Sequence, residues 1–261
     1  MKEYLNEIYW RLRRWMSSGH APPYKLQIAP TYRCNLRCQF CAWPWLNRGK
    51  SELSSRMYMK IIGEAKELGI NFVNIDGGGE PFVRKDTTMA IIKKVKNLDM
   101  KGGITTNGTL LTSKIIKEIV LLEWDEITFS IDAPFSRLHD MLRGKKGTFN
   151  ILIKNIEELN FFKRKFKKEY PILIINCVLT RKNFTLISEM IKLAKKLECT
   201  HVNFIPMLVH RKEAQILKLK ERNIPTLFYE IRKGIEISKE LNISSNLNSL
   251  LKDKNLILKT N

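Results

Sequence analysis

The stretch "TYRCNLRCQFCAWPW" occupies residues 31–45 and contains Cys34, Cys38 and Cys41. Three thiols therefore lie within eight residues, and the other two cysteines of the chain are far away in sequence. An odd number of closely spaced cysteines does not form a disulfide framework, which would also need an oxidising compartment. Structural zinc usually takes four ligands, often as two spaced pairs. Three thiolates with one open position are typical of an iron–sulfur cluster that leaves one iron free to bind a substrate.

The size of the chain, 261 residues, is sufficient for one large hydrophobic core, and α/β barrels of this length are common as single domains. Lys and Arg number 46 against 26 Asp and Glu, which gives a formal net charge of +20. This charge predicts either an anionic partner, such as RNA or a membrane surface, or simply solvated, lysine-rich helix faces. The basic residues are spread along the chain, with one dense run at 163–168, so we favour the compositional explanation.

The N-terminal segment, "MKEYLNEIYWRLRRWMSS", contains many charged residues and lacks the apolar core of a signal peptide. No stretch approaches the ~18 consecutive apolar residues of a transmembrane helix. We therefore expect a cytoplasmic protein without a transmembrane segment.

Short β-rich segments alternate with amphipathic ones along the chain. Strands are expected at 24–29, 72–76, 102–106, 126–131, 172–180 and 201–207. Helices are expected near 53–68, 86–98, 112–122, 147–166, 185–197 and 225–241. This alternation predicts βαβ units with a parallel sheet, and right-handed crossovers wind such a sheet into an open doubly wound form or a barrel.

The predicted strands carry polar residues on one parity. These residues are Gln27, Asn74, Asp76, Thr105, Ser130, Asp132, Asn176 and Asn203. Because side chains alternate between the two faces of a strand, one face of the sheet is expected to be polar. The interior of an ordinary barrel is packed with apolar side chains, so a polar inner face predicts a cavity for a polar ligand. The alternative is that residues such as Asp76 and Asn107 act only as local caps at strand ends.

Polar, turn-rich segments follow the first four predicted strands. The cysteine segment follows the first strand, and it is joined by "DGGGEPF" (76–82), "TNGT" (106–109) and "SIDAP" (130–134). The triple glycine allows a close backbone approach to a ligand, but it lacks the spacing of a phosphate-binding loop. Enzymes with parallel sheets bind ligands at the carboxyl ends of their strands, so the four segments are expected to converge on one rim.

The Cys-x3-Cys-x2-Cys spacing of "CNLRCQFC", followed in order by "GGGEP", "TTNG", "FSIDA" and "HDMLRGKKGTF", resembles the radical SAM superfamily over about residues 22 to 208. The resemblance implies an α/β fold, a partial (β/α)6 TIM-like barrel at 21–210. An amphipathic N-terminal helix (1–20), expected to pack on the underside or edge of the barrel, and a helical C-terminal extension (211–261) flank it. A non-catalytic zinc or electron-transfer module is the competing class, but it leaves the other three segments without a role.

The resemblance also implies a set of site residues. Cys34, Cys38 and Cys41 would ligate three irons of a 4Fe–4S cluster, and S-adenosylmethionine would bind the fourth. Contacts to S-adenosylmethionine are implied for Phe40 near the adenine, for Gly78, Gly79 and Glu80 at the amino group, for Ser130 and Asp132 at the ribose or carboxylate, for Arg143 at the carboxylate, for Asn176 and Ile205 at the carboxylate or adenine, and for Asn107.

The implied function is reductive cleavage of S-adenosylmethionine to a 5′-deoxyadenosyl radical that abstracts hydrogen from a peptide or a small metabolite. The motifs are closest to the peptide- and cofactor-maturing branch of the superfamily. An electron donor such as ferredoxin or flavodoxin is implied, as is an anaerobic host or a reducing compartment. RNA modification is the alternative, motivated by the charge of +20.

Several aromatic residues and cysteines remain outside this site. Trp43 and Trp45 are expected either to shield the cluster or contact the substrate, or only to pack. Cys177 and Cys199 are expected in the core. Many members carry a cysteine-rich C-terminal domain for auxiliary clusters, whereas this chain has no cysteine after Cys199, which predicts either a single cluster or a shortened chain.

Overall fold

The computed structural model describes residues 2–41 and 51–252, with side chains from residue 8 onward. Within these residues the strands form one parallel sheet in which each strand pairs with the next along the chain. The strands are β1 (Lys25–Ile28), β2 (Phe72–Ile75), β3 (Lys101–Thr106), β4 (Glu126–Ser130), β5 (Ile172–Leu179), β6 (His201–Pro206) and β7 (Ser244–Ser245). The sheet is open, because β1 and β7 end it without pairing to each other.

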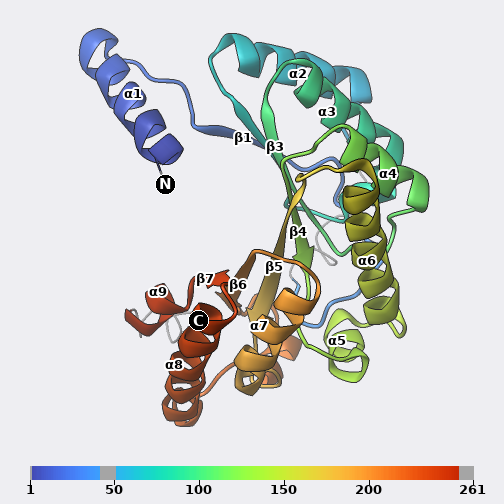
Figure 1. The fold of residues 1–261 in the computed structure, drawn as a ribbon, viewed down its shortest axis with the longest axis vertical. Helices are drawn as coiled ribbons and strands as arrows, with labels where there is room; N and C mark the ends of the chain where they lie inside the picture. The colour runs from blue at the N-terminus through green and yellow to red at the C-terminus, as the bar shows by residue number, and fades with distance from the viewer. Residues whose placement is uncertain (1, 42–50, 253–261) are drawn as a thin grey trace.

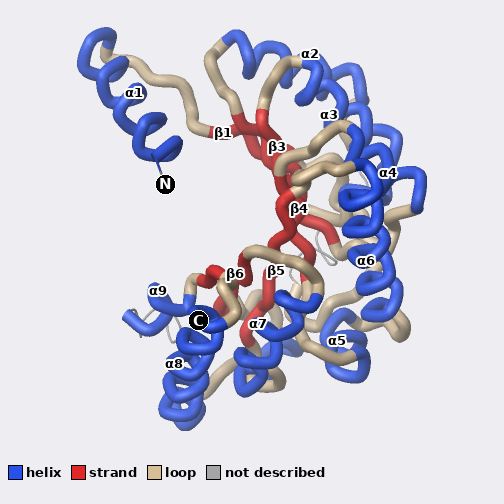
Figure 2. Tube along the Cα trace, in the orientation of Figure 1, coloured by secondary structure: helices blue, strands red, loops and turns tan. Residues whose placement is uncertain are grey.

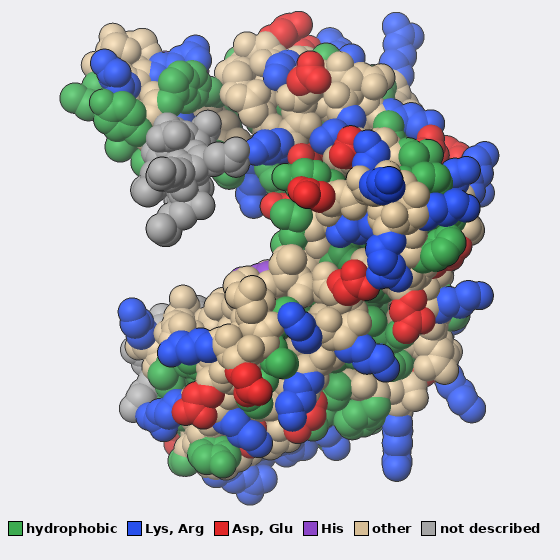
Figure 3. Space-filling view, viewed as in Figure 1, with side chains coloured by type: hydrophobic (Ala, Val, Ile, Leu, Met, Phe, Trp, Pro, Cys, Tyr) green, Lys and Arg blue, Asp and Glu red, His purple; other side chains and the backbone are tan. Residues whose placement is uncertain are grey.

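Helices connect the strands and cover the convex side of the sheet, while the concave side is open (Figures 1 and 2). The helices are α1 (Lys2–Ser18), α2 (Ser55–Glu67), α3 (Lys85–Asn97), α4 (Ser113–Leu121), α5 (Ser136–Arg143), α6 (Thr148–Phe166), α7 (Ile187–Lys196), α8 (Ile224–Glu240) and α9 (Leu247–Lys252). Short 3-10 helices lie at η2 (Pro81–Arg84), η3 (Phe184–Leu186), η4 (Lys212–Leu217) and η5 (Glu221–Asn223). In the space-filling view the molecule is hollowed on the side between α1 and the region of α8 and α9 (Figure 3).

The main hydrophobic core lies between the sheet and the helices. Along β5, Leu173, Ile175 and Cys177 are buried on the helix side, while Asn176 is half-buried on the concave side. The strands β2, β4 and β6 show the same alternation of buried and half-buried residues. Their polar residues therefore also lie on the concave side. The core also contains Cys199, so the predicted core positions of the two outlying cysteines are confirmed.

One glycine in β3 is required by this core. A Cβ atom on Gly102 would lie 1.9 Å from the indole ring of Trp124, which is fully buried. Because glycine has no side chain, Gly102 leaves room for Trp124, the largest of the fully buried side chains.

The predicted α/β fold is confirmed, and all six predicted strands are present. The seventh strand was not predicted, because two residues are too short to show an alternating pattern. The helices α5 and α9 were also missed, since eight and six residues give little periodicity. The boundaries at 20/21 and 210/211 stay a prediction, although α8 and α9 contribute Leu227, Ile231 and Leu247 to the same core as the sheet.

The expected packing of the N-terminal helix on the barrel is wrong. The helix α1 stands apart from the sheet (Figure 1) and makes no extensive contact with any described helix or strand. Its apolar side chains remain open to solvent: Tyr9 is 62% exposed, Leu12 56%, Trp15 60% and Met16 83%. The helical spacing of these residues correctly predicts an amphipathic helix, but an apolar face does not reveal what covers it.

Candidate functional site

The cysteine-containing segment leaves the carboxyl end of β1 and forms the wall of a cavity of ≈ 240 Å³. Cys38 is buried, with 8% of its surface exposed, whereas Cys34 and Cys41 are half-buried. The backbone N–H of Cys41 donates to the carbonyl of Cys38 at 3.2 Å, so the two thiols are held on one turn. The cavity is lined by Tyr32, Cys34, Leu36, Cys38, Cys41, Gly77, Gly78, Gly79, Glu80, Thr105, Thr106, Asn107, Ser130 and Arg143.

The glycine turn after β2 packs directly on this segment. Backbone N–H groups of Gly79 and Glu80 donate to the carbonyls of Thr31 and Arg33, at 2.8 and 2.9 Å. A Cβ atom on Gly79 would lie 2.0 Å from the Arg33 carbonyl oxygen. Gly78 has a φ of +68°, in the left-handed region that favours glycine. The glycine turn, which we predicted to approach a ligand closely, thus also packs against the backbone next to Cys34.

The end of α5 holds the same segment from the other side. The backbone N–H groups of Arg37 and Gln39 donate to the carbonyls of Arg143 and Leu142, at 3.2 and 2.8 Å. Gly144 ends α5 with a φ of +68°, and a Cβ atom there would lie 2.3 Å from the Arg37 carbonyl oxygen. The cysteine segment is therefore clamped between the glycine turn and α5.

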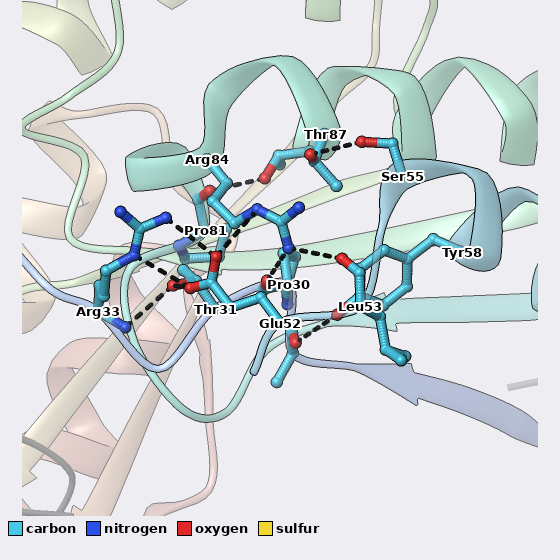
Figure 4. A network of polar contacts seen from close by, with 12 residues as sticks. Pro30, Thr31, Arg33, Glu52, Leu53, Ser55, Tyr58, Pro81, Arg84 and Thr87 are labelled. Atoms are coloured by element: carbon cyan, nitrogen blue, oxygen red, sulfur yellow. Dashed lines mark hydrogen bonds and ion pairs between the residues drawn. The ribbon is translucent and has the colours of Figure 1, made fainter. Parts of the chain in front are cut away.

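A polar network fixes the chain on both sides of the cysteine segment (Figure 4). The Glu52 carboxylate accepts from Thr31 and from Arg33, whose Nε and Nη2 each lie at 3.0 Å, and it pairs with Arg84 Nε at 3.3 Å. Arg84 Nη1 donates to the carbonyls of Pro30 and Leu53, at 2.8 and 3.0 Å. Burial would raise the pKa of Glu52, but the hydrogen bonds from Arg33 and Thr31 hold it below its usual range.

Glu80 faces the cavity but is already fully hydrogen-bonded within the protein. Its Oε1 accepts from the Thr106 hydroxyl at 2.7 Å and from the Phe82 N–H at 3.2 Å, and its Oε2 accepts from the Asn107 N–H at 2.7 Å. Burial raises the pKa of Glu80, and these three donors oppose that shift. Glu80 therefore joins the glycine turn to the end of β3, in addition to lining the cavity.

Arg143 lies between a buried carboxylate and a thiol. Its Nε is 2.6 Å from Asp132 Oδ2, its Nη1 is 3.7 Å from Cys38 Sγ, and its guanidinium carbon lies 5.4 Å from the centre of the Phe40 ring. Burial lowers the pKa of the Arg143 guanidinium, but Asp132 and Cys38 outweigh this effect and raise it. Arg143 thus carries a fixed positive charge next to the central cysteine.

Asp132 occupies a different place from the one the alternation of β4 predicts. Its side chain is fully buried, and it is not among the residues that line the cavity in the described chain. Oδ1 accepts from the Val178 N–H at 2.9 Å, and Oδ2 pairs with Arg143. The strand β4 ends at Ser130, so the parity that holds along the strand does not extend to Asp132.

The remaining predicted residues fall into two groups. Asn107 and Ser130 line the main cavity, and the Asn107 Nδ2 lies 4.0 Å from Cys34 Sγ. Phe40 and Ile205 instead line a neighbouring cavity of ≈ 210 Å³, which shares Cys41 with the first. Asn176 lies beside Ser130 in the register of β4 and β5, but its side-chain Oδ1 accepts from Asn203 Nδ2 at 3.1 Å, and it lines neither cavity.

Sequence reasoning missed several residues of this site. Tyr32, Leu36 and Thr106 line the cavity without having been predicted, although the "TTNG" motif contained the signal for Thr106, whereas Thr105 lines it as the polar parity of β3 predicts. Glu52 carried no signal, since it lies outside every motif and after the end of the cysteine segment. The predictions for Trp43 and Trp45 lie outside the described residues.

The donor set fits an iron–sulfur cluster better than a single ion. Among the described residues, no three His, Cys, Asp or Glu side chains converge closely enough to hold one metal ion. The three thiols are instead distributed around one cavity, which suits a cluster in which each thiolate ligates a different iron.

The chain belongs to the radical SAM superfamily, whose family model matches residues 28–174. Members of this family use a 4Fe–4S cluster together with S-adenosylmethionine. A curated relative from Pyrococcus furiosus, the tungsten-containing aldehyde ferredoxin oxidoreductase cofactor-modifying protein, is 28% identical over 171 residues, which cover 63% of this chain and 46% of the relative.

Solved structures confirm the partial-barrel fold. The Streptococcus suis protein SuiB bound to S-adenosylmethionine matches with a TM-score of 0.71 and 20% identity, over 94% of this chain and 55% of SuiB. The structure of anSMEcpe with bound AdoMet and a Cp18Cys peptide matches with a TM-score of 0.66 and 19% identity, over 86% of this chain and 64% of the other. The chain spans about half the length of the curated relative and of SuiB. Among the described residues, no helix has the length and apolar character to cross a bilayer.

Proposed function

We propose that Cys34, Cys38 and Cys41 ligate the 4Fe–4S cluster and that S-adenosylmethionine occupies the adjoining cavity of ≈ 240 Å³. The observation that carries the proposal is the meeting of three thiols, the glycine turn and Arg143 at the carboxyl ends of four parallel strands. When bound, the two cofactors would supply one-electron reductive cleavage of S-adenosylmethionine and abstraction of a hydrogen atom from the substrate.

Burial and Arg143 have opposite effects on the thiolate form of the cysteines. Burial raises the pKa values of the Cys34 and Cys38 thiols, which opposes the thiolate form that iron requires. Arg143 opposes this shift at Cys38, because a positive charge at 3.7 Å stabilises the thiolate. Asp132 holds the guanidinium in place, and its own negative charge acts in the opposite sense by raising the pKa of the Cys38 thiol.

The cavity walls also suit a zwitterionic ligand. Thr105, Asn107 and Ser130 present polar side chains there, and the backbone of Gly78 and Gly79 is accessible without side chains. The apolar cavity of Phe40, Val178, Ile205 and Met207 next to Cys41 suits an adenine ring. A ligand that spans both cavities would pass Cys41, which lines each of them.

We propose a peptide or a small metabolite as the substrate. The curated relative is named for cofactor modification, and structures similar to this chain include SuiB bound to precursor peptide SuiA and anSMEcpe bound to peptides. The hydrogen-bonded side chains of Asn176, Asn203 and His201 on the open concave face support a polar substrate. The open sheet gives such a substrate access from the side.

Anaerobic reconstitution tests the proposed function. We expect about four irons per chain, and we expect 5′-deoxyadenosine after addition of S-adenosylmethionine and dithionite. Alanine at any one of Cys34, Cys38 or Cys41 should abolish both, whereas alanine at Cys199 should abolish neither. A colourless protein with one tightly bound zinc would contradict the proposal. Mass spectrometry of peptides and metabolites after turnover would then identify the substrate.

RNA modification is the second candidate, favoured by the formal net charge of +20. Binding to RNA releases counterions, so the affinity should fall steeply as the salt concentration rises. Tight binding of structured RNA with a steep salt dependence would favour this candidate. Weak binding at physiological salt, with 5′-deoxyadenosine still formed, would favour the peptide or metabolite.

A further inference from the structure

In the cysteine segment, the buried Cys38 lies between two residues whose side chains are at the protein surface. Cys38 is 8% exposed, while its neighbours Arg37 and Gln39 are both exposed. The peptide groups of these two neighbours are fixed by hydrogen bonds to the end of α5. This outer side of the segment is therefore a rigid and short route between solvent and the site that the three thiols form.

Basic side chains surround this route. Arg37 lies against Gly144, and Lys145 and Lys146 follow directly and are exposed. On the other side of the segment, Arg211 Nη2 donates to the Gln39 carbonyl at 2.6 Å. We call Arg37, Lys145, Lys146 and Arg211 the basic rim.

Two carboxylates lie near the basic rim, and both are engaged. Asp140 accepts from the Gly147 N–H at 2.6 Å, from the Thr148 hydroxyl at 2.7 Å and from the Phe149 N–H at 2.9 Å, so it caps α6. Glu213 lies 4.0 Å from Arg211. Among the described residues, the basic rim thus contributes four positive charges beside the segment that holds Cys38, against the two negative charges of Asp140 and Glu213.

We propose that the basic rim is the docking surface for an acidic protein that carries single electrons. The inference rests on the proposed function, because cleavage of S-adenosylmethionine consumes one electron. In each cycle the docked protein is oxidised by one electron and the cluster is reduced by one. Opposite charges accelerate encounter and orient the two proteins, which favours an acidic carrier over a neutral or basic one. The rigid contact between α5 and the cysteine segment then fixes the distance of electron transfer.

A pair of charge-reversed variants tests the proposal. Lys145→Glu/Lys146→Glu reverses two charges of the basic rim. Lys195→Glu/Lys196→Glu reverses two adjacent exposed lysines at the end of α7, just before β6. Both variants change the net charge equally, so only the position of the change differs.

Two measurements are made anaerobically on reconstituted protein, with an acidic flavodoxin as the probe. The first is the rate at which the reduced flavodoxin bleaches the cluster absorbance, and the second is the binding of flavodoxin by calorimetry. We expect the basic-rim variant to be reduced about tenfold more slowly and to bind more weakly, and the wild-type rate to fall with salt. The α7 variant should retain the wild-type rate, and dithionite should reduce all three proteins to the same extent.

Equal slowing in both variants, or no slowing in the basic-rim variant, would overturn the docking surface while leaving the proposed function intact. A reconstituted wild-type protein without any dithionite-reducible cluster would overturn the proposed function, and the docking surface with it.

Discussion

Asp132 and Arg143 form an ion pair inside the protein, with 2.6 Å between Oδ2 and Nε and side chains that are 0% and 9% exposed. The same guanidinium reaches Cys38 Sγ at 3.7 Å through Nη1. Arg143 therefore places a positive charge beside the Cys38 thiol, and the Asp132 carboxylate balances that charge on the other side of the guanidinium. Because both groups are buried, removal of either one leaves an uncompensated charge in a region of low dielectric constant.

Replacement of Arg143 with Met should destabilise the protein by about 3–5 kcal/mol, because Asp132 would remain buried without its partner. The free energy of unfolding of the iron-free protein in urea measures this effect. Asp132→Asn/Arg143→Met removes both charges and should recover part of the loss. The exposed pair of Arg164 and Glu198 provides a control, since Arg164→Met should change stability by less than ~1 kcal/mol. Equal stability of the single and double variants would refute a charge-based cost.

Replacement of Gly79 with Ala should displace the cysteine segment, because the new Cβ would lie 2.0 Å from the Arg33 carbonyl oxygen. We expect reduced iron binding and a lower melting temperature. Gly63 in the middle of α2 is the matched control: nothing lies within 4 Å of its Cβ position. Gly63→Ala should stabilise the protein by up to ~1 kcal/mol through helix propensity. Normal iron content in Gly79→Ala would show that the segment can move away without consequence.

The buried histidine of α5 should make stability depend on pH. Burial is the main cause that lowers the pKa of His139 from 6.5 to about 3. Below pH 6.5 the unfolded chain takes up a proton that the folded protein does not, so stability should fall by about 1.4 kcal/mol per pH unit until the folded pKa is reached. The Nδ1 of His139 accepts from the Asp132 N–H at 3.3 Å, which Asn can imitate. Urea unfolding at pH 7.5 and pH 5 should show this slope in the wild type and a shallower one in His139→Asn; equal slopes would assign the dependence to other groups.

Glu52 should hold the two ends of the cysteine segment together. Glu52→Gln removes the charge that binds Arg33 and Arg84, so the two ends of the segment should separate more easily. We expect faster loss of iron to a chelator, with secondary structure unchanged by circular dichroism. Glu64→Gln is the control, because its pair with Lys60 lies on the surface with both side chains more than half exposed. Identical rates of iron loss in the two variants would remove Glu52 from the support of the site.

The sequence predicts the framework of this site better than its contacts. The spacing of the cysteines and the order of the turn motifs place Cys38, Gly79 and Asn107 on one rim, because parallel strands bring their carboxyl ends together. Strand alternation also places Ser130 correctly, but it stops at the end of β4 and therefore fails for Asp132. Periodicity describes the direction of a side chain only while the backbone remains regular.

Pairings between distant residues were not accessible from the sequence. Glu80 resembles a free carboxylate at a ligand site, yet Thr106, Phe82 and Asn107 donate to its oxygens. Likewise, the amphipathic pattern of α1 indicates an apolar face but not the absence of a covering element in the described chain. Both outcomes depend on tertiary packing, to which a local pattern gives no access.

The strands pair strictly in chain order, so neighbours in space are neighbours in the gene. Among the residues that the structure describes, all those that line the cavity of the three thiols lie between Tyr32 and Arg143, in the first four strand–helix units. The later strands β5 and β6 instead contribute Val178 and Ile205 to the neighbouring cavity. A mutation or recombination event after α6 can therefore reshape that neighbouring cavity while the residues that line the cavity of the three thiols are inherited unchanged.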